Sequence, residues 1–379
     1  MIDWLGIGHL FELSAAEAVA GFFTPLAIFA VFFVAHVVLP AIRVPGYVIN
    51  PETGEPRNYR LNGILVYVIA LVVWWFELTG MPREWFYKSS LYAVVGGTVF
   101  TLIFSVFAVF RHPEHQGRNW FLALWDGRVR EISLFNERID LKMWFYVVGG
   151  TMLSLNALSG AWYNYERFGD DFNPGVWMYA IFMTIYVVDY FIFERVQLYT
   201  YDVIHENLGF KMFWGGIMVF GWLFIIPLWG MAAHPHPGWS PLWTNVLLIG
   251  TAVMYLTGWV ISRGTNMQKY VFKRWPDRKF LGLIEPKFIQ AGDRKILYSG
   301  MWGLARHLNY LGEGFYSLAG ALVFGYFLNP WAWIYFIYVL ALFTWRQRDD
   351  DRLCAEKYGP EKWAEYQQKV KYRIIPGIY

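Results

Sequence analysis

Long apolar segments alternate with shorter polar segments along most of this chain. A helix needs about 20 apolar residues to cross the roughly 30 Å hydrocarbon core of a bilayer. Segments of about that length lie near residues 17–42, 62–80, 90–110, 143–163, 174–194, 212–233, 241–261, 311–328 and 330–345. Because backbone groups in lipid must be hydrogen-bonded within the protein, each segment is predicted to be a helix. The pattern predicts an all-α polytopic membrane protein, a bundle of nine transmembrane helices, or ten if one segment is split or interfacial.

Composition supports this interpretation. Of the 379 residues 56% are hydrophobic and only 16% are charged, which is too apolar for one soluble domain of this length. The net charge of +3 is spread over separate loops, so we expect a lipid bilayer and no nucleic acid as partner. Aromatic residues make up 21% of the chain, which suits interface belts and core packing or, alternatively, a pocket for a flat apolar substrate.

Positive charges predict the orientation in the membrane. They gather after the odd-numbered segments, at Arg43, Arg57, Arg60, Arg111, Arg118, Arg128, Arg130, Arg138, Arg195, Lys211 and Arg263 to Lys295. The loop 234–240 contains no lysine or arginine. The positive-inside rule therefore places the charged connections and the C-terminal tail in the cytoplasm.

Two acidic residues lie within or at the end of the fifth apolar segment. Asp189 and Glu194 would each cost about 2.5 kcal/mol or more if unpaired at the bilayer centre, so they should face a cavity or a partner. Glu194 could instead lie at the interface and pair with Arg195 or Lys211. Asp189 is about one turn deeper and is a stronger candidate for a functional acid.

The loop that follows carries Asp202, His205 and Glu206, which are metal-ligand types. A second cluster with suitable spacing is missing, and His234 and His236 are expected on the opposite side of the membrane. We therefore predict no metal site.

A basic and aromatic region follows the seventh segment. The loop 263–300 leads into Arg306–Tyr310, and the tail adds Arg346, Arg348, Lys357, Tyr358, Tyr372 and Arg373. Arginine can bind phosphate oxygens bidentately and an aromatic face can stack on a base, so these residues suit a nucleotide. The chain has neither a Rossmann GxGxxG nor a P-loop motif. Any nucleotide pocket is therefore expected at the cytoplasmic ends of helices, although many of the loop lysines could simply follow the positive-inside rule.

Three motifs in the last third of the chain resemble those of the sterol reductase family. That family includes the Δ14-, Δ7- and Δ24(28)-sterol reductases and the membrane domain of the lamin B receptor. The matching residues are Arg263, Asn266, Gln268, Lys269, Phe272, Lys273, Gly300, Trp302, Gly303, Arg306, His307, Asn309, Tyr310, Gly312, Cys354, Lys357, Tyr358, Gly359, Trp363, Tyr366, Val370, Tyr372, Arg373, Pro376 and Tyr379. Weaker matches include Asp140-Leu141-Lys142, Asp189, Glu194 and Asp202.

The resemblance implies one integral membrane domain over residues 1–379 that reduces a sterol carbon–carbon double bond with NADPH. Residues 1–261 would supply helices around a sterol-side pocket, and 262–379 the cofactor-binding helices and a cytoplasmic tail. The residues implied to hold NADPH are Asn266, Lys269, Arg306, His307, Asn309, Tyr310, Asp350, Lys357, Tyr358, Tyr372 and Arg373. The short N-terminal part resembles bacterial members, which implies a bacterial inner membrane.

The implied reaction needs an acid as well as a hydride. An isolated alkene is a poor hydride acceptor, so a proton must first reach one carbon, and the resulting cation then takes the hydride. The candidate donors are Asp189, Glu194, Asp202 and Tyr310, with the three carboxylic acids favoured. The substrate would be a sterol or a related polycyclic isoprenoid, and the Δ14 bond is favoured.

Two other functions are compatible with parts of the sequence. Isoprenylcysteine carboxyl methyltransferases share a related Arg-His core and a basic aromatic tail, but bind S-adenosylmethionine. A non-catalytic sterol-binding protein is the second alternative, because Asp349 stands where the sterol reductase family has an arginine. That departure also leaves the choice between NADPH and NADH open.

Overall fold

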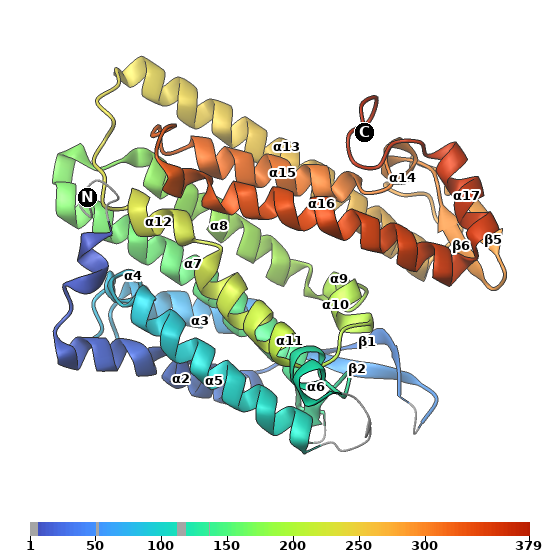
Figure 1. Cartoon of the computed structure of the whole chain (residues 1–379), viewed down its shortest axis with the longest axis horizontal. Coiled ribbons are helices and arrows are strands. Elements are labelled where there is room, and N and C mark those ends of the chain that lie inside the picture. The colour runs from blue at the N-terminus through green and yellow to red at the C-terminus, as the bar shows by residue number, and fades with distance from the viewer. Residues whose placement is uncertain (1–6, 51–52, 112–118, 136) are drawn as a thin grey trace. The chain divides into compact units, whose positions relative to one another are not determined.

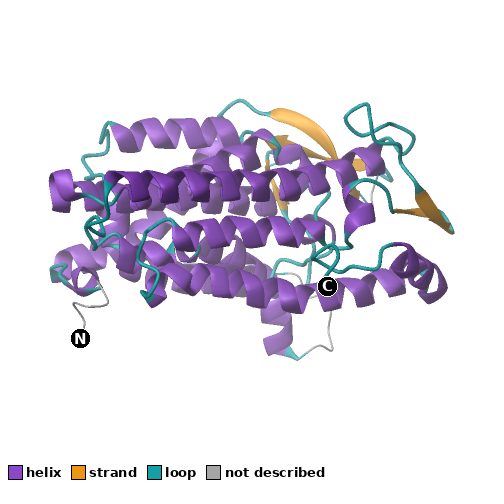
Figure 2. Cartoon of the chain, turned by 90° about the horizontal axis from the view of Figure 1, so that it is seen from above, coloured by secondary structure: helices purple, strands orange, loops and turns teal. Residues whose placement is uncertain are grey.

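The structure is a computed structural model that describes residues 7–50, 53–111, 119–135 and 137–379. Helices dominate these residues, and the named strands form three short antiparallel hairpins (Figure 1, Figure 2). The predicted helical class is therefore confirmed, although the all-α expectation omitted the hairpins, which lie in connections between helices. The chain divides into two compact units, Met1–Gly238 and Trp239–Tyr379.

The first unit contains most of the helices. Its elements are η1 (Gly8–Phe11), α2 (Ala15–Val38), β1 (Ile42–Ile49), β2 (Pro56–Leu61), α3 (Gly63–Trp75), α4 (Trp85–Lys88), α5 (Ser90–Phe110), α6 (Trp120–Asp126), β3 (Ser133–Leu134), β4 (Ile139–Asp140), α7 (Leu141–Phe168), η2 (Gly169–Asp171), α8 (Pro174–Ile192), α9 (Glu194–Gln197), α10 (Tyr201–Ile204), α11 (Phe210–Trp214), η3 (Gly215–Leu223) and α12 (Ile226–Met231). The segment η3 is a π-helix.

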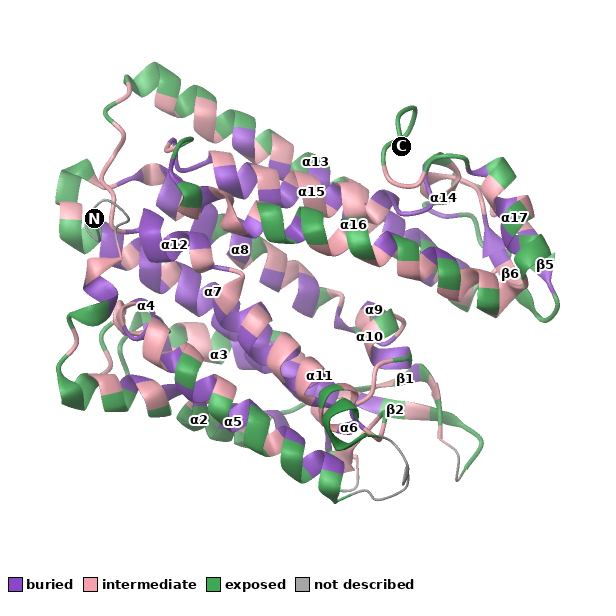
Figure 3. Cartoon of the chain, viewed as in Figure 1, coloured by how far each residue is buried: buried purple, intermediate pink, exposed green. Residues whose placement is uncertain are grey.

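Helix α7 forms the centre of the first unit and is buried for most of its length (Figure 3). It packs most extensively against α8 and η3. Gly149 permits the close approach to η3, because a Cβ atom there would lie 2.1 Å from the carbonyl oxygen of Gly216. Asn156 donates to the carbonyl oxygen of Gly221 at 2.8 Å, which satisfies a backbone acceptor in the π-helical segment. The surrounding helices thus enclose α7 as the central element of the first unit.

The second unit has three long helices, and α15 lies between α13 and α16 (Figure 1). Its elements are α13 (Pro241–Arg274), β5 (Phe288–Ala291), β6 (Arg294–Leu297), α14 (Met301–Leu304), α15 (Leu308–Leu322), α16 (Pro330–Tyr358) and α17 (Pro360–Lys369). Gly258 and Gly312 allow α13 and α15 to touch, since a Cβ atom on Gly258 would lie 2.6 Å from the carbonyl oxygen of Gly312. A small apolar core joins the β5–β6 hairpin to Trp363 and Tyr366 of α17.

Five helical segments of the described chain are long and apolar enough to cross a bilayer. They are Ala15–Val38, Ser90–Phe110, Pro174–Ile192, Phe210–Met231 and Pro241–Arg274. On α13, Leu242, Val246, Ile249, Val253 and Val260 are exposed at helical spacing, as expected for a surface that contacts lipid.

The chain is therefore an integral membrane protein, but the predicted count of nine to ten spans is not confirmed. Gly63–Trp75 is apolar but shorter than a span. Among the loop arginines used for orientation, Arg118 lies outside the described residues.

Candidate functional site

The end of α13 holds the segment that leads into α15. The Gln268 side chain donates to the carbonyl oxygen of Ser299 at 2.9 Å and accepts from the Met301 N–H at 2.9 Å. Gly300 lies between them at φ 61°, a conformation that side-chain-bearing residues rarely adopt, and a Cβ atom there would lie 2.4 Å from Gln268 Nε2. Two of the predicted motifs are therefore in direct contact.

The same contact includes Lys269 and Trp302. Trp302 Nε1 donates to the carbonyl oxygen of Thr265 at 2.9 Å, which fixes the indole against α13. The ammonium of Lys269 lies 4.7 Å from the centre of the Trp302 ring, within cation–π distance. Lys269 itself is exposed, so its charge is accessible on this face of the unit.

Arg306 and His307 connect the start of α15 to the C-terminal tail. The Arg306 N–H donates to the carbonyl oxygen of Tyr372 at 3.0 Å, and the His307 N–H donates to that of Arg373 at 2.7 Å. Arg306 is 5% exposed, and its Nη1 donates to the carbonyl oxygen of Val370 at 2.9 Å. Backbone and side chain together hold the tail against the Arg-His motif.

Asp351 on α16 is the carboxylate at the centre of this junction. It lies 3.4 Å from Arg306 Nη2, 3.3 Å from His307 Nε2 and 3.6 Å from Arg373 Nε. Burial raises the pKa of Asp351, but the His307 hydrogen bond and the charges of Arg306, His307 and Arg373 outweigh it and hold the pKa below its ordinary value. Asp351 was absent from the predicted site because nothing in three consecutive aspartates shows which one faces α15.

A stack of three rings adjoins the carboxylates. His307 lies parallel to Tyr310 with ring centres 5.2 Å apart, and Tyr310 stacks on Phe343 of α16 at 4.2 Å. The Tyr310 hydroxyl donates to Asp350. Phe343 was also absent from the predicted site, because an aromatic residue within an apolar segment gives no functional signal.

Basic groups gather around the end of α16. Burial, followed by the charges of Lys269 and Arg294, lowers the pKa of Lys357. Arg294 Nη1 also donates to the carbonyl oxygen of Lys357 at 3.0 Å. The neighbouring Tyr358 ring lies nearly parallel to that of Trp363, with centres 6.3 Å apart. Lys269, Arg294 and Lys357, here called the basic cluster, form a site that would attract an anion.

The remaining predicted cofactor residues lie on α13, on α15 and in the C-terminal tail. Asn266 is on α13 and Asn309 is in the first turn of α15, and both side chains are half-buried. Tyr372 is 38% exposed in the tail. All eleven residues implied by the family resemblance therefore lie within the second unit.

The candidate acids other than Tyr310 lie in the first unit. Glu194 is 4% exposed, and its Oε2 accepts the N–H of Gly63 at 3.2 Å, at the beginning of α3. The first N–H groups of a helix have no intrahelical acceptor, so this contact stabilises the helix end. Lys211, considered above as a partner of Glu194, instead lies 2.7 Å from Glu206.

Asp202 lies on α10 and Asp189 on α8, and both are half-buried. The Tyr146 hydroxyl donates to Asp202 Oδ2 at 2.9 Å. Tyr190 was not anticipated: its hydroxyl is buried, has no hydrogen-bond partner among the described residues, and lies within electrostatic range of Glu194 and Asp202.

Within the described part of the chain, no group of three or more histidine, cysteine, aspartate or glutamate side chains is arranged to hold a metal ion.

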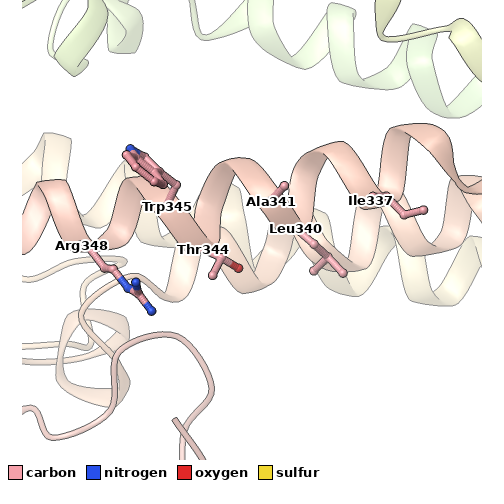
Figure 4. Close-up of a pocket in the computed structure, with 6 residues that line it drawn as sticks. All are labelled: Ile337, Leu340, Ala341, Thr344, Trp345 and Arg348. Atoms are coloured by element: carbon pink, nitrogen blue, oxygen red, sulfur yellow. The ribbon is translucent and has the colours of Figure 1, made fainter.

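A shallow apolar hollow runs along one face of α16 (Figure 4). Its lining residues are Ile337, Leu340, Ala341, Thr344, Trp345 and Arg348. Arg348 provides the single charged group in this lining, and the exposed indole of Trp345 points away from it (Figure 4). The hollow is therefore lined mainly by apolar side chains and has one charged side chain at its end.

Comparison with known proteins gives a consistent result over almost the whole chain. The model of the Ergosterol biosynthesis ERG4/ERG24 family matches residues 4–379. A Delta(14)-sterol reductase of Methylotuvimicrobium alcaliphilum is 31% identical, over 86% of this chain and 76% of its own length. A Delta(14)-sterol reductase of Arabidopsis thaliana is 34% identical, over 92% of this chain and 95% of its own length. A 7-dehydrocholesterol reductase of Danio rerio is 28% identical, over 89% of this chain and 74% of its own length.

The chain therefore belongs to the ERG4/ERG24 family of sterol reductases. This confirms the family, and with it the class of membrane-bound oxidoreductase, that the motifs near Arg306 and in the tail predicted. The match also reaches the N-terminal third of the chain, where we had found no resemblance.

Proposed function

We propose that this protein reduces a sterol carbon–carbon double bond, the Δ14 bond, with NADPH as the hydride source. The observation that carries the proposal is the similarity to two proteins named Delta(14)-sterol reductase, at 31% and 34% identity over most of the chain. We further propose that it lies in a bacterial inner membrane with the C-terminal tail in the cytoplasm. The bacterial relative and the positive loop charges support that placement.

The second unit has residues that fit NADPH. The cofactor carries three phosphate groups, and the basic cluster offers three cations close together with aromatic rings beside them. Lys269, Lys357 and the tail residues Tyr372 and Arg373 would hold its phosphate and adenosine parts. Asn266, Asn309 and the His307–Tyr310 stack would contribute polar and aromatic contacts.

NADPH supplies a hydride when it is bound. The part of the protein is to bind the cofactor in one orientation, to present the sterol alkene, and to keep water from the carbocation. Asp351 helps because it holds Arg306, His307 and Arg373 around one ionised carboxylate, so that the α15 start and the tail form one rigid surface.

Asp202 is the proton donor that we propose among the four candidates. The hydroxyl of Tyr310 already donates to Asp350, whereas Glu194 and Asp202 each use one carboxyl oxygen as an acceptor, for the Gly63 N–H and the Tyr146 hydroxyl. We favour Asp202 because Glu194 has the structural task of accepting the first N–H of α3. Asp202 Oδ2 accepts the hydrogen bond from the Tyr146 hydroxyl, and the proton to be transferred would lie on the other carboxyl oxygen. The carboxyl is thereby fixed in direction, as general acid catalysis requires. Asp189 is the second choice.

The direct test is an activity assay on purified, detergent-solubilised protein with NADPH. Sterols with Δ14, Δ7 or Δ24 double bonds would be offered separately and the products identified by mass spectrometry. We expect a mass gain of two hydrogens on the Δ14 sterol. Reduction of another bond would contradict the Δ14 assignment alone. Binding of S-adenosylmethionine in place of NADPH would contradict the proposed function as a whole.

A further inference from the structure

A buried lysine in the first unit makes an unusual set of contacts. Lys142 is 1% exposed, and its ammonium donates to three backbone carbonyl oxygens. The acceptors are Asp202 at 3.1 Å, Val203 at 3.0 Å and Glu206 at 2.6 Å. An ammonium has three N–H groups, so these contacts use all of them. One buried charge thus holds the segment 202–206.

The contacts explain why a cation is needed at this position. Helix α10 ends at Ile204, and the carbonyl groups of a final helical turn have no N–H partners within the helix. Lys142 supplies donors where the backbone has none, whereas an arginine is planar and a glutamine offers only two N–H groups.

Helix α7, which carries Lys142, also holds the Asp202 side chain. Tyr146 lies four residues after Lys142 on α7, so both side chains are on one face. Its hydroxyl donates to Asp202 Oδ2 at 2.9 Å. Helix α7 therefore contacts Asp202 at two places. Lys142 donates to its backbone carbonyl oxygen, and Tyr146 donates to its carboxyl.

Helix α7 is capped at its N-terminus and buried along most of its length. Asp140 caps its N-terminus by accepting the N–H groups of Lys142 at 3.0 Å and Met143 at 3.1 Å. Most residues of α7 are buried by neighbouring helices. Lys142 and the helix that carries it are thus both buried, and the contacts of Asp202 with Lys142 and Tyr146 tie it to α7.

We propose that Lys142 is a positioning residue for the reduction, acting by fixing the segment 202–206 so that Asp202 presents its carboxyl in one direction. This inference rests on the proposed function, in which Asp202 donates the proton. Lys142 contacts neither substrate nor cofactor in this role.

A double-mutant cycle tests the inference in the full-length protein. The variants are Lys142→Met, Asp202→Asn and their combination, with kcat, KM for the sterol and the NADPH dissociation constant measured for each. Lys211→Met is the matched control, because Lys211 contacts the Glu206 carboxylate at 2.7 Å and is 40% exposed. If Lys142→Met is not recovered from the membrane, Lys142→Gln, which keeps two donors, replaces it in the same cycle.

We expect Lys142→Met to lower kcat by about tenfold or more while KM and NADPH affinity stay within about twofold of the wild-type values. The combined variant should be no slower than Asp202→Asn alone, because Lys142 acts through Asp202. Lys211→Met should remain as active as the wild type. Multiplicative losses in the combined variant, or an equal loss of NADPH affinity in Lys142→Met, would overturn the proposal.

Amide hydrogen exchange separates this inference from the function on which it rests. Exchange in residues 203–209 should increase clearly more in Lys142→Met than in Lys211→Met, which loses only the ion pair with Glu206, without any substrate present. Unchanged exchange in Lys142→Met would overturn the role of Lys142 in holding the segment. Full activity of Asp202→Asn, in contrast, would overturn the assignment of Asp202 as the proton donor. It would therefore also overturn the role of Lys142 in the reduction.

Discussion

Arg306 Nη1 donates a hydrogen bond of 2.9 Å to the carbonyl oxygen of Val370, 64 residues further along the chain. The same nitrogen lies 3.2 Å from the carbonyl oxygen of Lys371. The family resemblance assigns Arg306 to the cofactor, and the geometry gives it a second task, which is to hold the tail that carries Tyr372 and Arg373. Its effect on cofactor binding would therefore be partly indirect.

Replacing Arg306 by alanine should lower NADPH affinity by at least about tenfold, because loss of a buried charge partner releases both the tail and Asp351. Limited trypsin digestion should cut faster after Lys369 and Lys371. Arg352→Ala is the control, since Arg352 on α16 has a 63% exposed side chain and pairs with Glu356. Unchanged NADPH affinity in Arg306→Ala, with an intact fold, would argue against this arrangement of the site.

Replacing Lys357 by methionine should weaken NADPH binding by about tenfold and NADH binding much less, because the basic cluster attracts the additional phosphate of NADPH. Titrations with both cofactors would measure the two dissociation constants. The matched control is Lys362→Met, a 49% exposed lysine that pairs with Glu365 on α17. Equal losses of affinity for NADPH and NADH would show that the additional phosphate binds away from Lys357.

Replacing Glu194 by glutamine should leave kcat within about threefold of the wild-type value, because the amide oxygen can still accept the Gly63 N–H. Glu194→Ala removes the acceptor and should cost about 1–3 kcal/mol in stability, seen as a lower unfolding temperature. If Glu194→Gln is instead as inactive as Asp202→Asn, the proton comes from Glu194.

The stability of the first unit should depend on pH through Asp140, at the start of α7. Burial, reinforced by the charge of Glu131, raises the pKa of Asp140 from 3.8 to about 7. The folded state therefore binds a proton more tightly than the unfolded state, and this contribution to stability is lost as the pH rises through about 7.

An asparagine at position 140 keeps the acceptor for the helix cap but cannot ionise. Asp140→Asn should therefore unfold at a higher temperature than the wild type at pH 8 and at about the same temperature near pH 4, since each pKa unit corresponds to about 1.4 kcal/mol. Thermal unfolding in detergent at both pH values measures this. Asp293→Asn, at a 93% exposed side chain, should show no such difference.

The sequence indicated the helices and the motifs of the candidate site, but not the partners that their residues contact. The apolar segments are long, and the Arg306–Tyr310 motif is local, so both can be recognised without a structure. The role of Asp351 could not be predicted, because it depends on how α16 is rotated against α15. The partner of Lys142 could not be predicted either, since its acceptors are backbone carbonyl groups about 60 residues away that have no side-chain signature.

The hairpins were missed for a similar reason. Strands β1 and β2 pair Arg43 with Arg60 and Val44 with Tyr59 in a connection that the arginines alone marked as a cytoplasmic loop. Glu131 contacts β2 of this hairpin, since it accepts from Tyr59 and lies 3.1 Å from Arg57. Such contacts between separate loops leave no periodic pattern.

The dependence of Arg306 on Val370 has a consequence for the order of assembly during synthesis. Helices α13 and α15 leave the ribosome before the tail, and domains generally form from the N-terminus onward. During that interval the guanidinium of Arg306 has not yet received its backbone acceptors from residues 370–372. The junction around Asp351 can therefore be completed only when the tail emerges, after α13, α15 and α16 have been synthesised.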